Sequence, residues 1–306
     1  MVTTPFEAYR SFIPDFEAFS QSLLEPLPMY IRINRLKCLR EERVINGLAQ
    51  KGVHLRSVTE IPDFYEISPW GFPIGTTEEY YLGYIYPQTI NSALPVLALN
   101  PQPGETILDL CAAPGSKTSY IAQRTEDRTL IVANDKRIDR LTALVSNLKR
   151  LGITGVVTTQ YRGEMFPMGP PFDKVLVDAP CSGEGRYRIT KEGEVLYRKE
   201  TRTDLPAIQK GLLLRAFDLV KTGGIVVYST CTFNPLENEA VVDYLLNRRP
   251  AEILKMDYPL PSHPGLKEFN GRVFDSRISH CARFYPHETH SVGFFIATIR
   301  RLSGSG

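Results

Sequence analysis

Two short runs of β-branched and other apolar residues are separated by a single helical pattern in the second half of the chain. The runs cover residues 172–177 and 224–228, and the helical pattern covers residues 205–220. Strands that are buried on both faces have this kind of continuous apolar sequence. Two parallel strands of one sheet need a connection of this kind, long enough to hold a helix. The pattern therefore predicts an α/β fold with a parallel sheet.

A cysteine follows each of these two strands closely. Cys181 lies in the sequence Asp-Ala-Pro-Cys-Ser-Gly of residues 178–183, and Cys231 lies in the sequence Ser-Thr-Cys-Thr of residues 229–232. Ligands of open α/β sheets bind beyond the carboxyl ends of the strands, so the two thiols are expected to share one site for covalent chemistry. The alternative is that each cysteine is a small buried hydrophobic residue, as free cysteines usually are.

A third strand pattern, residues 106–109, leads into a loop of small residues and then a helix that extends to about Arg124. Small residues let the backbone approach a ligand, and the N–H groups at a helix start favour an anion or a carboxylate. Ser116 stands where a Walker A loop needs glycine, and the single Gly115 argues against a dinucleotide fingerprint. The loop residues expected at a cofactor are Cys111, Ala112, Ala113, Pro114, Gly115, Ser116 and Lys117.

The next strand pattern, residues 129–134, ends at Asp135, which lies about twenty residues beyond the loop. Rossmann-like folds place an acid at this point to hold the hydroxyl groups of a ribose. Asp135 is therefore a candidate for ribose binding. A second role fits the local sequence equally well, since Asp135 could also cap the start of a helix predicted for residues 138–151.

Three sequence motifs, in the order in which they occur, carry a family resemblance. They are Leu-Asp-Leu-Cys-Ala-Ala-Pro-Gly-Ser-Lys-Thr at residues 108–118, Val-Asp-Ala-Pro-Cys-Ser-Gly-Glu-Gly at 177–185, and Tyr-Ser-Thr-Cys-Thr at 228–232. With these motifs the chain resembles the Sun/Fmu family of RNA cytosine-5 methyltransferases. The resemblance covers roughly residues 30 to 300, since further matches are residues 31–34, Gln88, and residues 237–239, 283–287 and 293–297.

The resemblance implies a Rossmann-like class I methyltransferase sheet with helices on both faces, together with a small N-terminal α+β domain. It also implies S-adenosyl-L-methionine as the methyl donor and an RNA substrate, either tRNA or rRNA. The nucleophile in this family is the cysteine of the Thr-Cys-Thr motif, which is Cys231 here. The cysteine of the Pro-Cys motif, here Cys181, assists elimination and release of the enzyme.

The same resemblance assigns roles to two charged residues. Asp178 is similar to the family carboxylate that hydrogen-bonds the cytosine edge and stabilises charge as carbon 6 is attacked, and it is also expected to face the cofactor. Lys117 is expected to position the base or to lower the pKa of a thiol, because a nearby cation favours the thiolate. Lys117 could equally be a solvated residue at the start of a helix.

One departure from the family pattern follows the strand pattern of residues 155–159. Members of the family commonly have an acid there that meets the amino group of adenine, but an alignment through Gly163 puts Arg162 at that position. Adenine recognition is therefore expected from another group, either Gln160 or a backbone carbonyl.

The composition fits a cytoplasmic enzyme without a membrane span. The 306 residues can bury a sizeable core, 42% of them are hydrophobic, and no apolar run reaches 18 residues. The N-terminus lacks the features of a signal peptide, so a reducing compartment with five free cysteines is expected. No pair of cysteines has C-x-x-C spacing. Metal binding is not expected, even at His280, Cys281, His287 and His290.

The net charge of +2 conceals an uneven distribution of charged residues. Residues 31–56 have a balance of +5, and residues 57–80 have a balance of −5. Residues 186–202 hold six Lys or Arg against three Glu, interleaved with Tyr187 and Tyr197. Such a segment is expected to contact RNA phosphates while its aromatic rings stack on unpaired bases. The alternative is a solvated charged face.

The chain is expected to form three parts. Residues 1–86 form the small RNA-contacting α+β domain, residues 87–302 form the catalytic domain, and residues 303–306 form a flexible tail. The elements predicted outside the central motifs are a helix at residues 40–51, strands at 30–33, 54–58 and 65–67, a helix at 87–99 and a late, antiparallel strand at 291–300.

Two other functions stay open at this point. A Rossmann-like oxidoreductase would bind a nicotinamide cofactor, but it would leave both strand-end cysteines without a role. A non-catalytic RNA-binding protein could keep the fold, but it would not need Asp178, Cys181 and Cys231 together.

Overall fold

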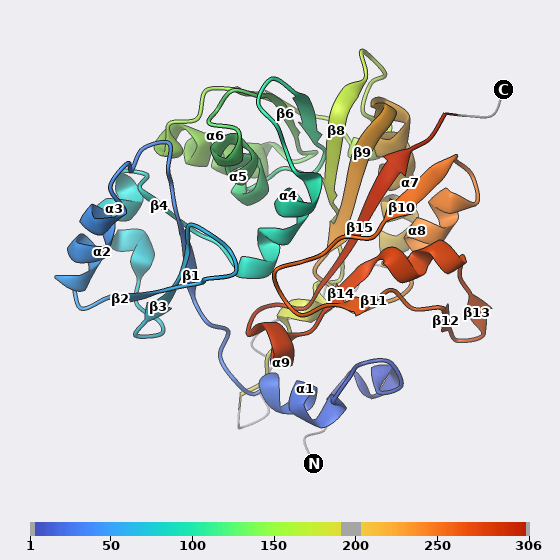
Figure 1. The fold of residues 1–306 in the computed structure, drawn as a ribbon, viewed down its shortest axis with the longest axis horizontal. Helices are drawn as coiled ribbons and strands as arrows, with labels where there is room; N and C mark the ends of the chain where they lie inside the picture. The colour runs from blue at the N-terminus through green and yellow to red at the C-terminus, as the bar shows by residue number, and fades with distance from the viewer. Residues whose placement is uncertain (1–3, 191–202, 304–306) are drawn as a thin grey trace.

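The computed structural model of the protein describes residues 4–190 and 203–303. A small four-stranded sheet lies in the N-terminal part, and a large nine-stranded sheet dominates the rest of the molecule (Figure 1). A separate two-stranded ribbon consists of β12 (Glu268–Phe269) and β13 (Arg272–Val273). Within the described residues, no helix has the length and apolar character that crossing a membrane requires.

The small sheet confirms the helix and the three strands predicted for this part of the chain. Its elements are β1 (Tyr30–Ile33), α2 (Glu41–Ala49), β2 (His54–Ser57), β3 (Phe64–Ser68), α3 (Glu78–Tyr81) and β4 (Ile85–Pro87). The strands are all antiparallel, in the order β2-β3-β1-β4. Val44 and Leu48 lie four residues apart on one face of α2, and both are fully buried in the core of this sheet.

The large sheet has a parallel centre and an antiparallel side. Its strands are β5 (Thr106–Asp109), β6 (Leu130–Asn134), β7 (Val156–Thr159), β8 (Phe172–Asp178), β9 (Val220–Thr230), β10 (Ala251–Leu254), β11 (His263–Pro264), β14 (Ala282–Phe284) and β15 (Phe294–Arg301). The order is β11-β14-β15-β9-β8-β5-β6-β7, and β10 also pairs with β15. The five strands from β9 to β7 are parallel, with α7 (Leu205–Leu219) between β8 and β9 in the chain. This confirms the predicted crossover, and β15 confirms the predicted antiparallel strand.

Helices cover both faces of the large sheet, as predicted. Besides α7 they are α4 (Leu94–Leu99), α5 (Ser116–Arg124), α6 (Ile138–Leu151) and α8 (Glu239–Leu246). A further short helix, α9 (Pro286–Thr289), lies below the sheet in Figure 1. Figure 1 shows α4, α5 and α6 on one side of the sheet and α7 and α8 on the other. Successive residues of a strand point to opposite faces, so Val175 packs with α7 and α8 while Leu176 packs with α4 to α6. Both faces are buried, which explains the continuous apolar runs.

The helix predicted for residues 87–99 is wrong at its start. Pro87 closes β4 and pairs with Ile31 of β1, so the backbone is extended there. A short 3₁₀ turn, Ile90–Ser92, precedes α4. Pro95 lies in the first turn of α4, where the missing N–H is tolerated because the first N–H groups of a helix have no partner within it. Strand pairing therefore overrides the helical pattern at this position.

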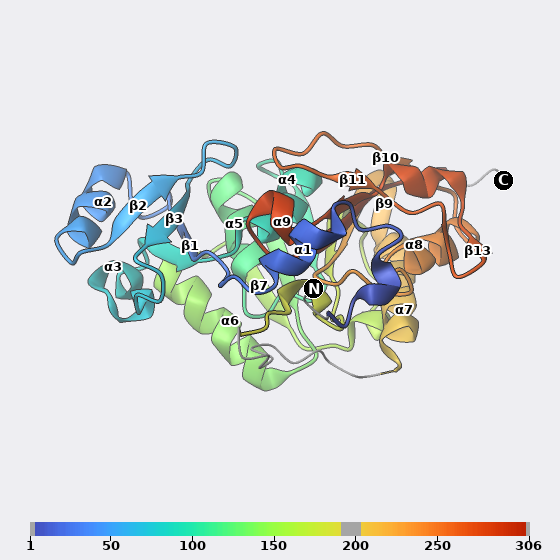
Figure 2. The same ribbon diagram turned by 90° about the horizontal axis from the view of Figure 1, so that it is seen from below.

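The first described residues lie against the large sheet. α1 (Phe16–Ser22) packs beside α9, as Figure 2 shows. The ring of Phe19 meets that of Phe233 edge-on, with 5.3 Å between the centroids. Ile189 N donates a hydrogen bond to Leu23 O at 2.9 Å. The domain boundary at residue 86 stays a prediction, but the segment before β1 belongs to the packing of the catalytic half.

Candidate active site

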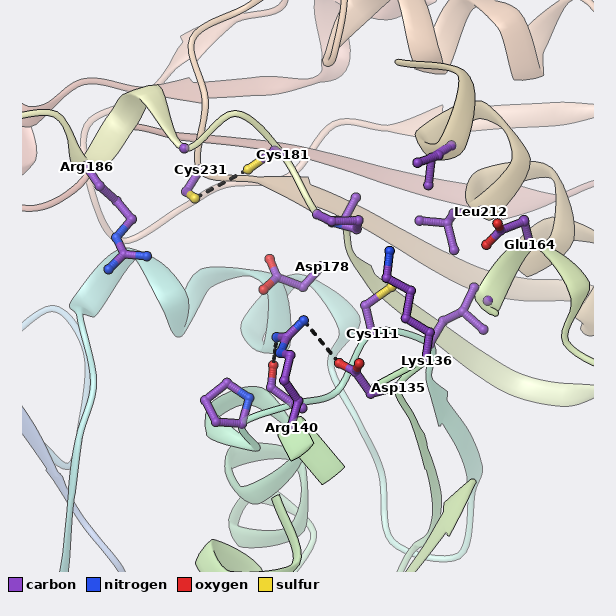
Figure 3. Close-up of a pocket in the computed structure, with 18 residues that line it drawn as sticks. Cys111, Asp135, Lys136, Arg140, Glu164, Asp178, Cys181, Arg186, Leu212 and Cys231 are labelled. Atoms are coloured by element: carbon purple, nitrogen blue, oxygen red, sulfur yellow. Dashed lines mark hydrogen bonds and ion pairs between the residues drawn. The ribbon is translucent and has the colours of Figure 1, made fainter. Parts of the chain in front are cut away.

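Cys181 and Cys231 lie side by side beyond the carboxyl ends of β8 and β9 (Figure 3). These strands are parallel neighbours in which Asp178 pairs with Ser229, so the segments that follow leave the sheet at the same edge. The two sulfur atoms are 3.4 Å apart, which is a hydrogen-bonding distance for thiols. The structure thus brings together the two cysteines that the sequence predicts to share a site.

The environments of the two thiols make them differ in acidity. The hydrogen bond from the Cys181 thiol lowers the pKa of Cys231 below its ordinary value, and the charges of Arg186 and Lys117 act in the same direction. The same hydrogen bond, together with burial, raises the pKa of Cys181 well above its ordinary value. The thiolate is the nucleophilic form of cysteine, so Cys231 is the better nucleophile and Cys181 is the protonated partner.

This difference predicts an order of alkylation. We expect iodoacetamide to modify Cys231 at a lower pH than Cys181, because only the thiolate reacts. In a Cys181→Ala variant the hydrogen bond that stabilises the Cys231 thiolate is gone, so its alkylation should move to higher pH. Peptide mass spectrometry across a pH series measures both profiles. An unchanged Cys231 profile in that variant would contradict the role of Cys181 as the donor.

Asp178, the last residue of β8, is held in place by hydrogen bonds on both carboxylate oxygens. Lys117 Nζ donates to Oδ2 at 2.6 Å, and Ser229 Oγ donates to Oδ1 at 2.9 Å. Lys117 is buried, and its Nζ also donates to Ser92 Oγ at 3.1 Å. Figure 3 shows the Asp178 carboxylate between the two thiols and Asp135. A carboxylate with a fixed orientation therefore lies next to the cysteine pair.

A buried network holds the two cysteine loops against each other. Glu237 accepts hydrogen bonds from Ser182 N at 2.9 Å and from Gln209 Nε2 at 3.0 Å. The Thr232 hydroxyl lies 2.7 Å from Ser182 Oγ and donates to Glu184 Oε2 at 3.1 Å. Each of these side chains is buried. The distance between the thiols therefore depends on the residues that flank the cysteines as well as on the strand register.

A cleft of about 310 Å³ opens in front of the thiols. The small-residue loop that precedes α5 contributes Cys111, Ala113 and Pro114 to its lining. Gly115 has a φ of +104°, a backbone conformation that is strained for residues with a side chain, so the turn into α5 favours glycine. The predicted loop residues that do not line the cleft are Ala112, Gly115, Ser116 and Lys117.

Asp135 lines the same cleft, and both of its carboxylate oxygens are engaged. Oδ1 accepts a hydrogen bond from Arg137 N at 3.0 Å, and Oδ2 pairs with Arg140 Nη1 at 3.2 Å. The N-cap of α6 is Arg137, so the alternative role of Asp135 as the cap of this helix is wrong. Arg140 also donates to the carbonyl of Ala113, and so ties Asp135 to the small-residue loop. Sequence reasoning missed Arg140.

Glu164 is a second lining residue that sequence reasoning missed. It lies on the 3₁₀ turn Gly163–Met165 that follows β7. Burial alone would raise the pKa of Glu164, but hydrogen bonds from its backbone and from Arg162 hold it below its ordinary value. Arg162 pairs with Glu164 at 2.6 Å and does not line the cleft, while Gln160 lines a separate hollow beside α6.

The basic stretch predicted to contact RNA falls mainly on residues 191–202, which lie outside the described residues. Arg188 is buried and donates to the Tyr187 carbonyl at 2.6 Å, so its guanidinium does not form part of the exposed charged face that the sequence suggests. The Tyr187 ring meets Phe6 edge-on, with 5.3 Å between the centroids. Arg186 is exposed and lines the cleft.

Three of the four possible metal ligands near the C-terminus, His280, Cys281 and His287, contact other protein groups. His280 Nδ1 lies 2.9 Å from the Ile253 carbonyl, and Cys281 is buried in the core beside α7 and α8. The His287 ring packs edge-on against Phe19. Across residues 4–190 and 203–303, no three His, Cys, Asp or Glu side chains form a group that could hold a metal ion. All five cysteines are free thiols.

Comparisons with known proteins point to one family. The model of the family described as 16S rRNA methyltransferase RsmB/F matches residues 96–300. A tRNA (cytosine(49)-C(5))-methyltransferase of Pyrococcus abyssi is 38% identical over 301 residues, which cover 95% of this chain and 94% of that protein. A 28S rRNA (cytosine-C(5))-methyltransferase of Mus musculus is 41% identical over 292 residues, which cover 92% of this chain and 36% of that protein.

A solved structure has the same fold over nearly its whole length. It is a methyltransferase homolog protein from Pyrococcus horikoshii, 33% identical, with a TM-score of 0.81 and coverage of 96% of this chain and 93% of that one. The chain spans only about a third of the length of the mouse relative. The resemblance to RNA cytosine-5 methyltransferases is thereby confirmed, and the chain belongs to the family described as 16S rRNA methyltransferase RsmB/F.

Proposed function

We propose that this protein is an S-adenosyl-L-methionine-dependent RNA (cytosine-5)-methyltransferase. The observation that carries the proposal is the meeting of a cysteine pair with a lysine–aspartate pair at one cleft. Cys231 and Cys181 have their sulfurs 3.4 Å apart, and Lys117 lies 2.6 Å from Asp178. Relatives named as cytosine-C(5)-methyltransferases of tRNA and rRNA support the same chemistry.

The chemistry of the cleft suits S-adenosyl-L-methionine, which supplies an electrophilic methyl group when bound. This cofactor is positively charged at its sulfonium and amino groups, and the lining offers carboxylates from Asp135, Glu164 and Asp178. Asp135 would hold the ribose hydroxyls, and Glu164 would accept a hydrogen bond from the adenine amino group. Cys111, Ala113 and Pro114, the loop residues that line the cleft, would contact the cofactor.

The roles of the active-site residues follow from the weak nucleophilicity of cytosine carbon 5. The Cys231 thiolate would form a bond to carbon 6, and the electrons displaced into the ring would make carbon 5 able to take a methyl group. Asp178, held by Lys117, would accept a hydrogen bond from the cytosine amino group and would favour the base in the form protonated at ring nitrogen 3, in which the charge displaced by the thiolate is neutralised. The fixed orientation of Asp178 supports this role, because it needs no rearrangement when the base arrives.

Release of the methylated base requires the loss of the carbon 5 proton to a base. The electron pair of that bond would restore the double bond between carbons 5 and 6 as the bond from carbon 6 to sulfur breaks. Cys181 would assist this step, because its thiol hydrogen-bonds to the departing sulfur of Cys231. In a reducing cytoplasm both thiols would stay available for repeated turnovers.

The Asp135→Ala variant is expected to bind S-adenosyl-L-methionine at least about tenfold more weakly, because a charge-assisted hydrogen bond to the ribose is lost. Asp139→Ala is the matched control. Asp139 lies on the exposed side of α6 and pairs with Arg137, so this variant should keep its affinity. Isothermal titration calorimetry measures both. Undiminished affinity in the Asp135→Ala variant would remove Asp135 from the cofactor site.

The experiment that tests the proposed function is transfer of a labelled methyl group from S-adenosyl-L-methionine to RNA. We expect label in RNA and new cytosines that resist bisulfite conversion. A bisulfite map of RNA from cells with and without the gene would identify the target. The Pyrococcus abyssi relative, which the chain covers over 94% of its length, is named for tRNA, and this favours a tRNA substrate over rRNA.

The two alternatives predict different results in the same assay. An oxidoreductase would bind a nicotinamide cofactor and transfer no methyl group to RNA. A non-catalytic RNA-binding protein would bind RNA but would leave its cytosines unmodified. Either result would overturn the proposal.

A further inference from the structure

A line of buried polar side chains runs from the small sheet to the active-site lysine. Arg32 of β1 donates from Nη1 to Gln88 Oε1 at 2.9 Å, and Gln88 Nε2 donates to Ser92 Oγ at 3.4 Å. Ser92 Oγ also accepts a hydrogen bond from Lys117 Nζ at 3.1 Å, and Lys117 donates in turn to Asp178. The first four of these residues are buried. The line of hydrogen bonds thus links β1 of the small sheet to the Asp178 carboxylate at the end of β8 in the large sheet.

Arg32 is a buried charge, and its hydrogen bonds to other described residues all go to neutral oxygen atoms. Its guanidinium donates to Ser119 Oγ at 2.8 Å and to Ser116 O at 3.3 Å, and it lies 4.9 Å from the centroid of the Tyr120 ring. Burial lowers the pKa of Arg32 to about 10, so it remains protonated at neutral pH. An unpaired buried charge is costly, and the neutral acceptors around it must be well oriented to compensate.

Arg32 also fixes the direction of the hydrogen bonds in the line. Arginine can only donate, so the oxygen of the Gln88 amide has to face Arg32 and its N–H group has to face Ser92. Gln88 thereby holds the Ser92 oxygen as an acceptor, and this oxygen is directed at the Lys117 ammonium. The ammonium is consequently held between two oxygen atoms, one from Ser92 and one from Asp178.

We propose that Ser92 is a positioning residue for Lys117, oriented from the small sheet by Gln88 and Arg32. Without the Ser92 hydroxyl the ammonium keeps one oxygen partner and can rotate away from Asp178. The carboxylate then loses the orientation that it needs when cytosine is attacked. Gln88 follows β4 and donates from its backbone N to Tyr30 O, so the small sheet controls this position directly. The inference rests on the proposed methyl-transfer function.

The test compares single-turnover methyl transfer in Ser92→Ala, Gln88→Leu and Gln123→Leu variants. Gln123 is the matched control, because it is buried and joins α5 to the Ile33 carbonyl of the small sheet without touching the active-site lysine. We expect Ser92→Ala and Gln88→Leu to slow transfer about tenfold, since each removes support from a charged group. The dissociation constants for RNA and cofactor should stay within about twofold, and Gln123→Leu should transfer at nearly the wild-type rate.

A double-mutant cycle determines whether Ser92 acts through Lys117. In a Lys117→Met background, adding Ser92→Ala should change the rate by less than about twofold, whereas an independent residue would lower it about tenfold again. Ser92→Thr keeps the hydroxyl and should recover most of the rate. If the Ser92→Ala variant does not fold, Gln88→Leu replaces it in the cycle.

Three results would overturn the inference while methyl transfer by the wild type stands. The first is a double variant of Lys117→Met and Ser92→Ala in which the two reductions in rate multiply. The second is equal slowing of methyl transfer by Gln123→Leu and Gln88→Leu. The third is a Ser92→Ala variant that has a lower melting temperature but an unchanged rate of methyl transfer. A wild-type protein that transfers no methyl group to any RNA would overturn the proposed function itself, and the inference with it.

Discussion

Cys231→Ala is expected to abolish methyl transfer to RNA, with a loss on the order of 10⁴-fold or more. Carbon 5 of cytosine cannot take a methyl group until a thiolate has added to carbon 6, and the variant has no thiol at this position. The Cys181 thiol is a poor substitute, because its pKa is raised well above its ordinary value by the hydrogen bond to Cys231 and by burial. Incorporation of labelled methyl groups into RNA measures the loss.

Cys38→Ala is the matched control for this variant. Cys38 is a free thiol in the core of the small sheet, and it does not line the cleft. Its replacement should leave the rate of methyl transfer within about twofold of the wild type. A Cys231→Ala variant that transfers methyl groups as fast as this control would show that another residue is the nucleophile.

Asp178→Asn is expected to slow methyl transfer by roughly 10²- to 10³-fold, a loss similar to that seen when one preorganised electrostatic contact to a transition state is removed. The amide keeps the shape of the carboxylate, but it has no negative charge to strengthen the hydrogen bond from the cytosine amino group or to favour the base protonated at ring nitrogen 3. It also cannot form the ion pair in which Lys117 Nζ lies 2.6 Å from Oδ2. Single-turnover kinetics at saturating RNA measures this effect on the chemical step.

Asp173→Asn, on the same strand, separates this effect from loss of stability. Asp173 lies at the other end of β8, where it accepts a hydrogen bond from Thr106 N at 2.8 Å and pairs with Lys221. This variant should lower the melting temperature but leave the single-turnover rate near that of the wild type. Equal rates for the two variants would mean that Asp178 has only a structural role.

The parts of the fold that depend on local patterns could be predicted from the sequence. The β-branched runs at β8 and β9 and the helix pattern between them determine a parallel pair, because both faces of these strands are buried. From this pair follows the proximity of Cys181 and Cys231, since residues beyond the ends of adjacent parallel strands meet at one edge. The position of Asp135 at the cleft follows from the next strand in the same way.

The parts that depend on loop conformation and on distant contacts could not be predicted in this way. Glu164 reaches the cleft because of a 3₁₀ turn whose geometry no periodic pattern records. Arg188 has the sequence context of a surface residue, but the structure buries it. The hydrogen bond from Arg32 to Gln88 joins residues 56 positions apart and depends on how β1 and β4 pair. The number of charged residues in a segment does not distinguish buried arginines such as Arg32 and Arg188 from solvated ones.

The most direct test of the proposed mechanism is a denaturing gel of the protein after incubation with RNA and S-adenosyl-L-methionine. We expect Cys181→Ala to accumulate a denaturation-resistant band of methylated RNA attached to Cys231, because attack and methyl transfer remain possible while elimination is impaired. Cys231→Ala should form no such band. A band that forms with Cys231→Ala and is missing with Cys181→Ala would contradict the account and make Cys181 the nucleophile.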